Sequence, residues 1–219
     1  MILDSNGLVV LEQTGPPGNT GDSCAETSRL MCLQHILKIP TISNVSLFLS
    51  PSGVIRYPGS VWGVSDTSSD QVAPLMSAVP CILEDEIISL IKGNGYKTGN
   101  NEYITLGCLA QLKRAEGSRI QFLYDLAIIG QALIFLLPWR WNDSTGGITP
   151  SSGSVADYLN FINFLAYAKI RHWTWSCRIA TWLVKQSTAY NAVVSYYRPE
   201  PNVMWLLDIY KQAIPEIWS

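Results

Sequence analysis

The stretch Gly21–Arg29 reads GDSCAETSR, and from here onward the sequence is patterned for helices. Ser23 followed by Glu26 fits the capping box S-x-x-E/Q, in which both side chains satisfy backbone N–H groups of a first helical turn. The same spacing recurs in Ser68 with Gln71 and in Ser118 with Gln121. The sequence therefore predicts three helix starts.

Further periodic segments predict the rest of a mainly α fold. We expect additional helices at about 82–92, 104–115, 154–171, 174–189 and 202–214. Together they predict antiparallel helix hairpins, arranged as a bundle, in a single helical domain over residues 1–219. Residues 93–101 and the Gly/Ser/Pro-rich residues 142–153 are predicted to be loops that join helices.

Two short β-hairpins are expected near the N-terminus, at about 1–20 and 45–58. Apolar runs flank Asn6-Gly7, a pair that supplies the positive φ angles of a type I′ turn. In the second segment, Pro51-Ser52-Gly53 can turn the chain. We predict that these hairpins are additions to another architecture.

Residues 122–139 (FLYDLAIIGQALIFLLPW) carry one charge in eighteen residues, a length at which a membrane span has to be considered. Asp125 and Gln131 argue against a span, because both would need polar partners in lipid. We therefore predict a central helix that is apolar all round because its neighbours cover it.

The composition narrows the classes of function. The 219 residues are 47% hydrophobic and 15% charged, with a formal net charge of −2. This excludes disorder and offers no broad basic surface to hold nucleic acid. The charged fraction is below the roughly 25% of typical globular chains. Some apolar surface is therefore expected to meet a partner or a membrane.

The cysteines and histidines predict neither a metal centre nor a cofactor. Five widely spaced cysteines without a C-x-x-C pair indicate neither a disulfide framework nor a zinc site. Two histidines cannot build a multi-histidine centre, so a carboxylate site for a hard cation is the one metal option left open. The first residues lack a secretory signal, which predicts a cytoplasmic protein.

The first candidate site is the stretch GDSCAETSR. Asp22 or Glu26 can act as an acid/base group. Arg29 can then set the charge state of that carboxyl group or bind an anionic substrate. The alternative is structural: Ser23 and Glu26 cap the helix and Arg29 neutralises Glu26 one turn away. Cys24 lies in a first turn, a position that lowers a thiol pKa, but no histidine follows at a recognised spacing.

The second candidate site is a loop-to-helix junction. Here Asp66 and Asp70 are the candidate acids, at a helix start that can orient a substrate. Tyr57 and Trp62 can form a stacking platform for it. The alternative is an ordinary first turn, beside loop aromatics that cover the core.

Two further acids, Asp125 and Asp157, lie in or near strongly apolar segments. A buried carboxylate is costly unless it is hydrogen-bonded, so each of them needs a partner. Either a structural network between helices or a polar cavity lined by helix starts would provide one.

Acidic helix starts with aromatic loops, in GDSCAETSR, DTSSDQ, FLYDL and VADYLN, resemble the α/α toroid of six-hairpin glycosidase-like enzymes and polysaccharide lyases. The resemblance implies a central cavity and an acidic glycan as substrate. It also implies that Arg29 and Arg56 meet a substrate carboxylate. The acids lining the cavity would be Asp22, Glu26, Asp70, Asp125 and Asp157. About four hairpins leave the six-hairpin ring incomplete. The chain also resembles uncharacterised proteins encoded by tailed phages.

Two classes of function follow. The first is a carbohydrate-active hydrolase or lyase, whose catalytic carboxylates come from Asp22, Glu26 and Asp70. The substrate-binding residues would be Arg29, Arg56, Tyr57, Trp62, Asp125 and Asp157. The alternative is a non-catalytic virion or assembly protein, a homo-oligomer or part of a larger assembly, whose Trp and Tyr residues serve subunit contacts. Nucleic acid is not expected as a partner, and a membrane protein is a third option, weaker than these two.

Overall fold

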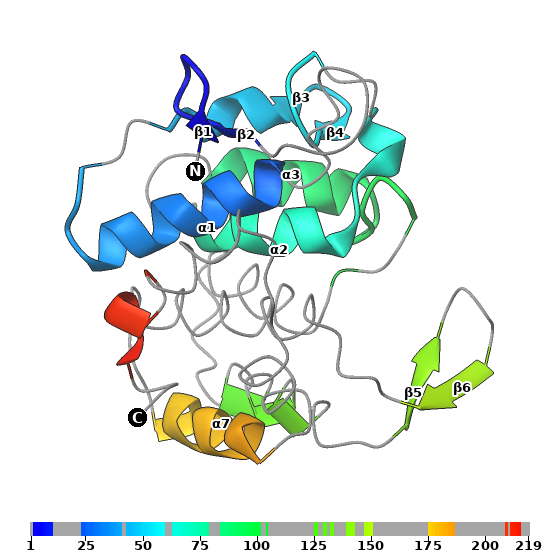
Figure 1. Cartoon of the computed structure of the whole chain (residues 1–219). Helices are drawn as coiled ribbons and strands as arrows, with labels where there is room; N and C mark the ends of the chain where they lie inside the picture. The colour runs from blue at the N-terminus through cyan, green and yellow to red at the C-terminus, as the bar shows by residue number, and fades with distance from the viewer. Residues whose placement is uncertain are drawn as a thin grey trace.

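The computed structural model of the chain is mostly helical (Figure 1). It describes residues 2–10, 23–40, 43–59, 63–78, 84–101, 104, 125–126, 129–130, 132–133, 139–142, 147–150, 175–186, 209 and 211–215.

The described helices lie where the sequence predicts them. α1 spans Ser23–Ile36 and α2 spans Ser69–Ala78, so the starts predicted at Ser23 and at Ser68 are confirmed, the second to within one residue. α3 (Glu84–Gly93) and α7 (Trp175–Lys185) confirm the helices expected at about 82–92 and 174–189.

Other helix predictions are covered in part or not at all. Residues 209 and 211–213 are helical, within the predicted segment 202–214. The start at Ser118 and the helix at 154–171 lie outside the described residues. So does the helix at 104–115, apart from Ile104.

The N-terminal hairpin is confirmed, but its turn differs from the expected one. β1 (Ile2–Leu3) pairs antiparallel with β2 (Val9–Val10). Gly7 has a positive φ of 73° and Asn6 does not, so the turn is not type I′. The Asp4 carboxylate accepts a hydrogen bond from the backbone N–H of Asn6 at 2.8 Å, and this local bond holds the turn instead.

The second hairpin is also confirmed, and both hairpins belong to the core. The 3-10 turn η1 (Val45–Phe48) leads into β3 (Leu49–Ser50), which pairs with β4 (Gly53–Val54). Leu8 of the first hairpin and Phe48 are fully buried in the main hydrophobic cluster. The expectation that the hairpins are additions is therefore wrong. Strand pairs this short depend on such packing, because a lone hairpin is marginally stable in water.

The main hydrophobic cluster lies between α1, α2, α3 and the two hairpins. Its buried members include Met31 of α1, Leu75 of α2 and Ile87 of α3. α1 is buried on every side from Ser23 to Leu33, so α1 is the central helix of this part of the fold (Figure 1).

The two helices at the centre, α1 and α2, begin side by side. The thiol of Cys24 lies 3.9 Å from the backbone oxygen of Gln71, so their first turns adjoin. The connection between them, residues 37–68, contains the β3–β4 hairpin. A tight antiparallel helix hairpin has a loop of roughly 2–5 residues. This pair is therefore not such a hairpin.

The predicted central helix at 122–139 is not covered all round. Its described residues from 125 to 133 are helical, with Asp125 and Ala132 buried. Leu126 and Leu133 are 48% and 45% exposed, which contradicts the expected cover. Positions seven apart share a helix face, so one face of this segment is buried and another is exposed.

A third hairpin occupies residues for which the sequence predicts the end of a helix and a loop. β5 (Trp139–Asn142) pairs antiparallel with β6 (Gly147–Pro150), and Trp141 lies opposite Ile148. Figure 1 shows this hairpin projecting to one side of the helices. Aromatic and β-branched residues favour strands, and cross-strand pairs of them stabilise hairpins.

The predicted loop after α3 is confirmed and is tied to its surroundings. The backbone N–H of Asn100 donates to the carbonyl of Thr67 at 3.0 Å, next to the 3-10 turn η2 (Val64–Asp66). The hydroxyl of Thr67 donates to the carbonyl of Val54 at 2.6 Å. A Cβ atom added at Gly99 would overlap the backbone carbonyl of Val64. The loop therefore links α3 to the β3–β4 hairpin.

Gly99→Ala tests this close approach. The backbone of Val64 cannot turn aside as a flexible side chain can, so we expect the free energy of unfolding to fall by about 3 kcal/mol. Gly93→Ala is the control, because a Cβ there meets nothing within 4 Å and alanine is the better helix former. Urea unfolding measures both variants, and equal stabilities would contradict the packing at Gly99.

Candidate functional site

The structure places the predicted site residues in three groups. Glu26, Arg29, Arg56, Tyr57 and Asp125 lie among the described residues. Asp70 lies in the first turn of α2, although its side chain is outside the description. Asp22, Trp62 and Asp157 lie outside the described residues.

Two hydroxyl groups of the stretch GDSCAETSR hold β2 against α1. The hydroxyl of Ser23 donates to the backbone carbonyl of Val9, and the backbone N–H of Val9 donates to the hydroxyl of Thr27 at 2.9 Å. Ser23 and Thr27 lie one turn apart on one face of α1. Together they satisfy both backbone polar groups of Val9. Ser23 thus starts the helix as predicted and also bonds to a separate strand.

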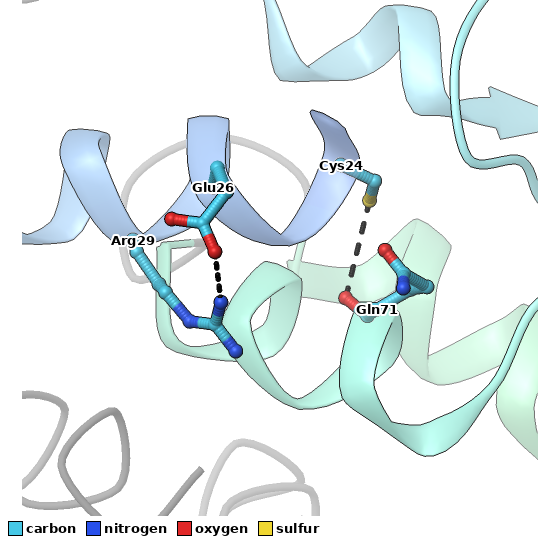
Figure 2. A network of polar contacts seen from close by, with 4 residues as sticks. All are labelled: Cys24, Glu26, Arg29 and Gln71. Atoms are coloured by element: carbon cyan, nitrogen blue, oxygen red, sulfur yellow. Dashed lines mark hydrogen bonds and ion pairs between the residues drawn. The ribbon is translucent and has the colours of Figure 1, made fainter. Parts of the chain in front are cut away.

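Glu26 and Arg29 form a buried ion pair. Figure 2 shows the carboxylate and the guanidinium pointing toward each other from neighbouring positions on α1. Both side chains are almost completely buried, so the pair lies away from solvent. This confirms one part of the structural interpretation, that Arg29 neutralises Glu26. The other part was a capping box, whereas the contacts described for the Ser23 hydroxyl and the Glu26 carboxylate go to Val9 and Arg29.

Cys24 is a buried thiol on the side of α1 that faces α2. Its Sγ lies 3.9 Å from the backbone oxygen of Gln71 (Figure 2). Burial raises the pKa of the Cys24 thiol well above its ordinary value, against smaller opposing effects of Ser28 and of the cations Arg29 and Arg56. The effect of a first helical turn, which would lower the pKa, is outweighed by desolvation. Cys24 is therefore protonated at neutral pH and is no nucleophile.

The loop residues Arg56 and Tyr57 also have structural contacts. The backbone carbonyl of Arg56 accepts the N–H of Cys24 at 3.0 Å, which satisfies an N–H group at the start of α1. The hydroxyl of Tyr57 donates to the Asp4 carboxylate at 2.8 Å, and its ring packs against the main hydrophobic cluster. Burial, followed by the bond to Asp4, raises the pKa of Tyr57. Tyr57 therefore covers the core and ties the first hairpin to this loop.

Asp125 is buried and has the partner that its position requires. The hydroxyl of Ser176, in the first turn of α7, donates to the Asp125 carboxylate. The bond joins the segment around residue 125 to α7, which fits a structural network between helices.

The two predicted acids whose side chains are described, Glu26 and Asp125, therefore each have a structural partner. Glu26 is bonded within α1, and Asp125 is bonded to α7. In the described part of the chain, no group of three or more His, Cys, Asp or Glu side chains could hold a metal ion. Within the same residues, no helix has the length and apolarity needed to cross a membrane.

One exposed surface was missed in the sequence. Trp175, Ile179 and Trp182 are 59%, 40% and 61% exposed, and we call these three residues the α7 face. Their spacing of four and three positions places them along one side of the helix. The opposite side is buried and consists of Ser176, Cys177, Ala180 and Thr181. The spacing was visible in the sequence, but helical periodicity normally assigns the large apolar side to the core.

No protein-family model, curated protein or solved structure matches this chain. Its function is therefore inferred from the geometry of its own residues.

The Glu26–Arg29 pair gives a testable expectation for stability. Glu26→Gln leaves the Arg29 charge buried opposite a neutral group, so we expect a loss of about 3–5 kcal/mol in the free energy of unfolding. The double change Glu26→Leu with Arg29→Met removes both charges and should recover most of that loss.

Glu86→Gln on α3 is the matched control for this series. Glu86 is exposed, so its removal should alter the stability by about 0.5 kcal/mol at most. Urea unfolding of the four proteins measures the series. If Glu26→Gln cost no more than Glu86→Gln, the pair would not be a buried structural contact.

Proposed function

We propose that this chain is a non-catalytic interaction protein that binds its partner through the α7 face. The observation that carries the proposal is the exposure of Trp175, Ile179 and Trp182 on a helix whose small residues face inward.

The orientation of α7 supports this proposal. A surface helix usually buries its large apolar side chains and exposes its polar ones. α7 does the reverse, because its buried side carries Ser176, Cys177, Ala180 and Thr181. Contiguous exposed apolar surface marks interaction sites in soluble proteins. Tryptophan is also among the residues most enriched at the positions that contribute most of the binding energy of an interface, and the α7 face has two of them.

The helical segment at residues 125–133 also exposes apolar side chains. Leu126 and Leu133 are exposed, and the bond between Ser176 and Asp125 joins this segment to α7. The low charged fraction of the whole chain agrees with a function in which apolar surface meets a partner. That partner can be another copy of the chain, as in a homo-oligomer or a virion assembly, or a different surface.

The proposal is tested with the double variant Trp175→Ala with Trp182→Ala. Association would be measured in parallel with another copy of the chain, with lipid vesicles and with an acidic polysaccharide. We expect the variant to keep its fold, because both side chains are mainly exposed, and to lose whichever association the natural chain shows.

Ile39→Ala is the control, since Ile39 is 48% exposed far along the sequence from α7. It should leave association unchanged. An association that survives the loss of both tryptophans, or no association in any arm, would contradict the proposal.

A carbohydrate-active enzyme is a second proposal, favoured by one observation. The first turns of α1 and α2 adjoin, and Asp70 belongs to the first turn of α2. In the sequence, Asp22 directly precedes α1. A pair of carboxylates at this end of the two helices would suit hydrolysis or elimination of an acidic glycan.

Asp70→Asn tests this second proposal on an acidic polysaccharide. If Asp70 is a catalytic acid, turnover should fall by at least about a hundredfold while the fold is kept. Glu86→Gln is the control acid. Absence of turnover in the natural chain, or turnover that Asp70→Asn leaves intact, would count against it.

We also propose an arrangement for the helices of the whole chain. They would form antiparallel hairpins, within one domain, as an incomplete toroid or a bundle. The cytoplasm is the proposed compartment, and the free, buried thiol of Cys24 is compatible with its reducing conditions.

A further inference from the structure

We propose that the partner of the α7 face is the surface of an anionic lipid bilayer, on which α7 lies flat. This inference rests on the proposed interaction function and names the chemistry of its partner.

The apolar part of the argument is the line of side chains along α7. Trp175, Ile179 and Trp182 follow one side of the helix, so all three can enter the interfacial layer of a bilayer together. Tryptophan is enriched at this depth, because its ring is apolar while its N–H group remains hydrated. The opposite side of α7 is held to the protein by the bond from Ser176 to Asp125. The helix therefore presents this face without unfolding.

The cationic part of the argument comes from the same helix. Arg178 is exposed, three residues after Trp175 and four before Trp182, so its guanidinium group belongs to the side that carries the α7 face. Lys185 is half-buried in the last turn. α7 contains no acidic residue. A phosphate-bearing surface would meet positive charge beside the inserted rings.

The surrounding sequence has the same charge. Residues 158–199 contain five Lys and Arg residues and no Asp or Glu. The rest of the chain holds the other ten basic residues of fifteen and all seventeen acidic ones. Along the sequence, basic charge is thus concentrated in α7 and on either side of it, in an otherwise acidic chain. Anionic lipids attract such segments, with about 1 kcal/mol for each Lys or Arg near the surface.

Other kinds of partner match either the apolar or the cationic side chains of α7, but not both. A symmetric dimer through the α7 face would bring two copies of Arg178 together. Nucleic acid would match the charge, but Ile179 offers no ring on which a base can stack. An anionic bilayer accommodates both the aliphatic and the cationic side chains.

The experiment is co-sedimentation of the full chain with vesicles of phosphatidylglycerol and phosphatidylcholine, compared with vesicles of phosphatidylcholine alone. We expect binding to the anionic vesicles and little to the neutral ones. Trp175→Ala with Trp182→Ala should weaken binding by about a hundredfold, because each ring removes apolar area that the bilayer would cover. Arg178→Gln should weaken binding to the anionic vesicles by about fivefold.

Two further variants serve as controls. Trp175→Phe with Trp182→Phe keeps the apolar rings and should retain most of the binding, whereas Ile39→Ala should retain all of it. Circular dichroism checks that every variant is folded. Equal binding to neutral vesicles, or binding that Arg178→Gln leaves unchanged, would overturn the role of anionic lipid.

The outcomes also separate this inference from the proposed function. If the chain ignores vesicles but forms oligomers that the double alanine variant dissociates, the lipid inference fails and the interaction function stands. If vesicle binding is unchanged in the double alanine variant, both fail.

Discussion

The described fold depends on one constraint, which is that α1 is buried on every side while its first two turns are polar. A polar group removed from water is costly unless it is hydrogen-bonded. Each buried polar side chain of α1 therefore needs a hydrogen-bond partner. Ser23 and Thr27 bond to Val9, Glu26 bonds to Arg29, and Cys24 contacts Gln71. These contacts set the positions of the first hairpin and of α2, and the hydrophobic cluster then forms around them.

The same constraint explains the structural contacts of four residues in the stretch GDSCAETSR. Acid, base and hydroxyl groups at a helix start are what a carboxylate enzyme needs, but they are also what a buried helix start needs. In α1 the second requirement takes up Ser23, Glu26, Thr27 and Arg29. Asp125 is used in the same way by Ser176. Function is therefore better sought on the surface.

α1 and α7 differ in which side chains they leave exposed. α1 buries an ion pair and hydroxyl groups, whereas α7 buries small residues and exposes Trp175 and Trp182. This exposure places part of the apolar content of the described residues outside the core. A protein arranged in this way keeps a stable interior while offering a surface that leaves water when a partner covers it.

The sequence by itself determined the features that neighbouring residues control: the helix starts near Ser23 and Ser68, and the turns after Asp4 and Pro51. Caps and turns are decided within about four residues, which one sequence displays in full. Only the tertiary structure decided that Ser23 meets Val9, that Cys24 is too deeply buried to react, and that the ring of Trp175 faces outward. Burial and hydrogen-bond partners depend on residues distant in sequence, so local periodicity does not display them.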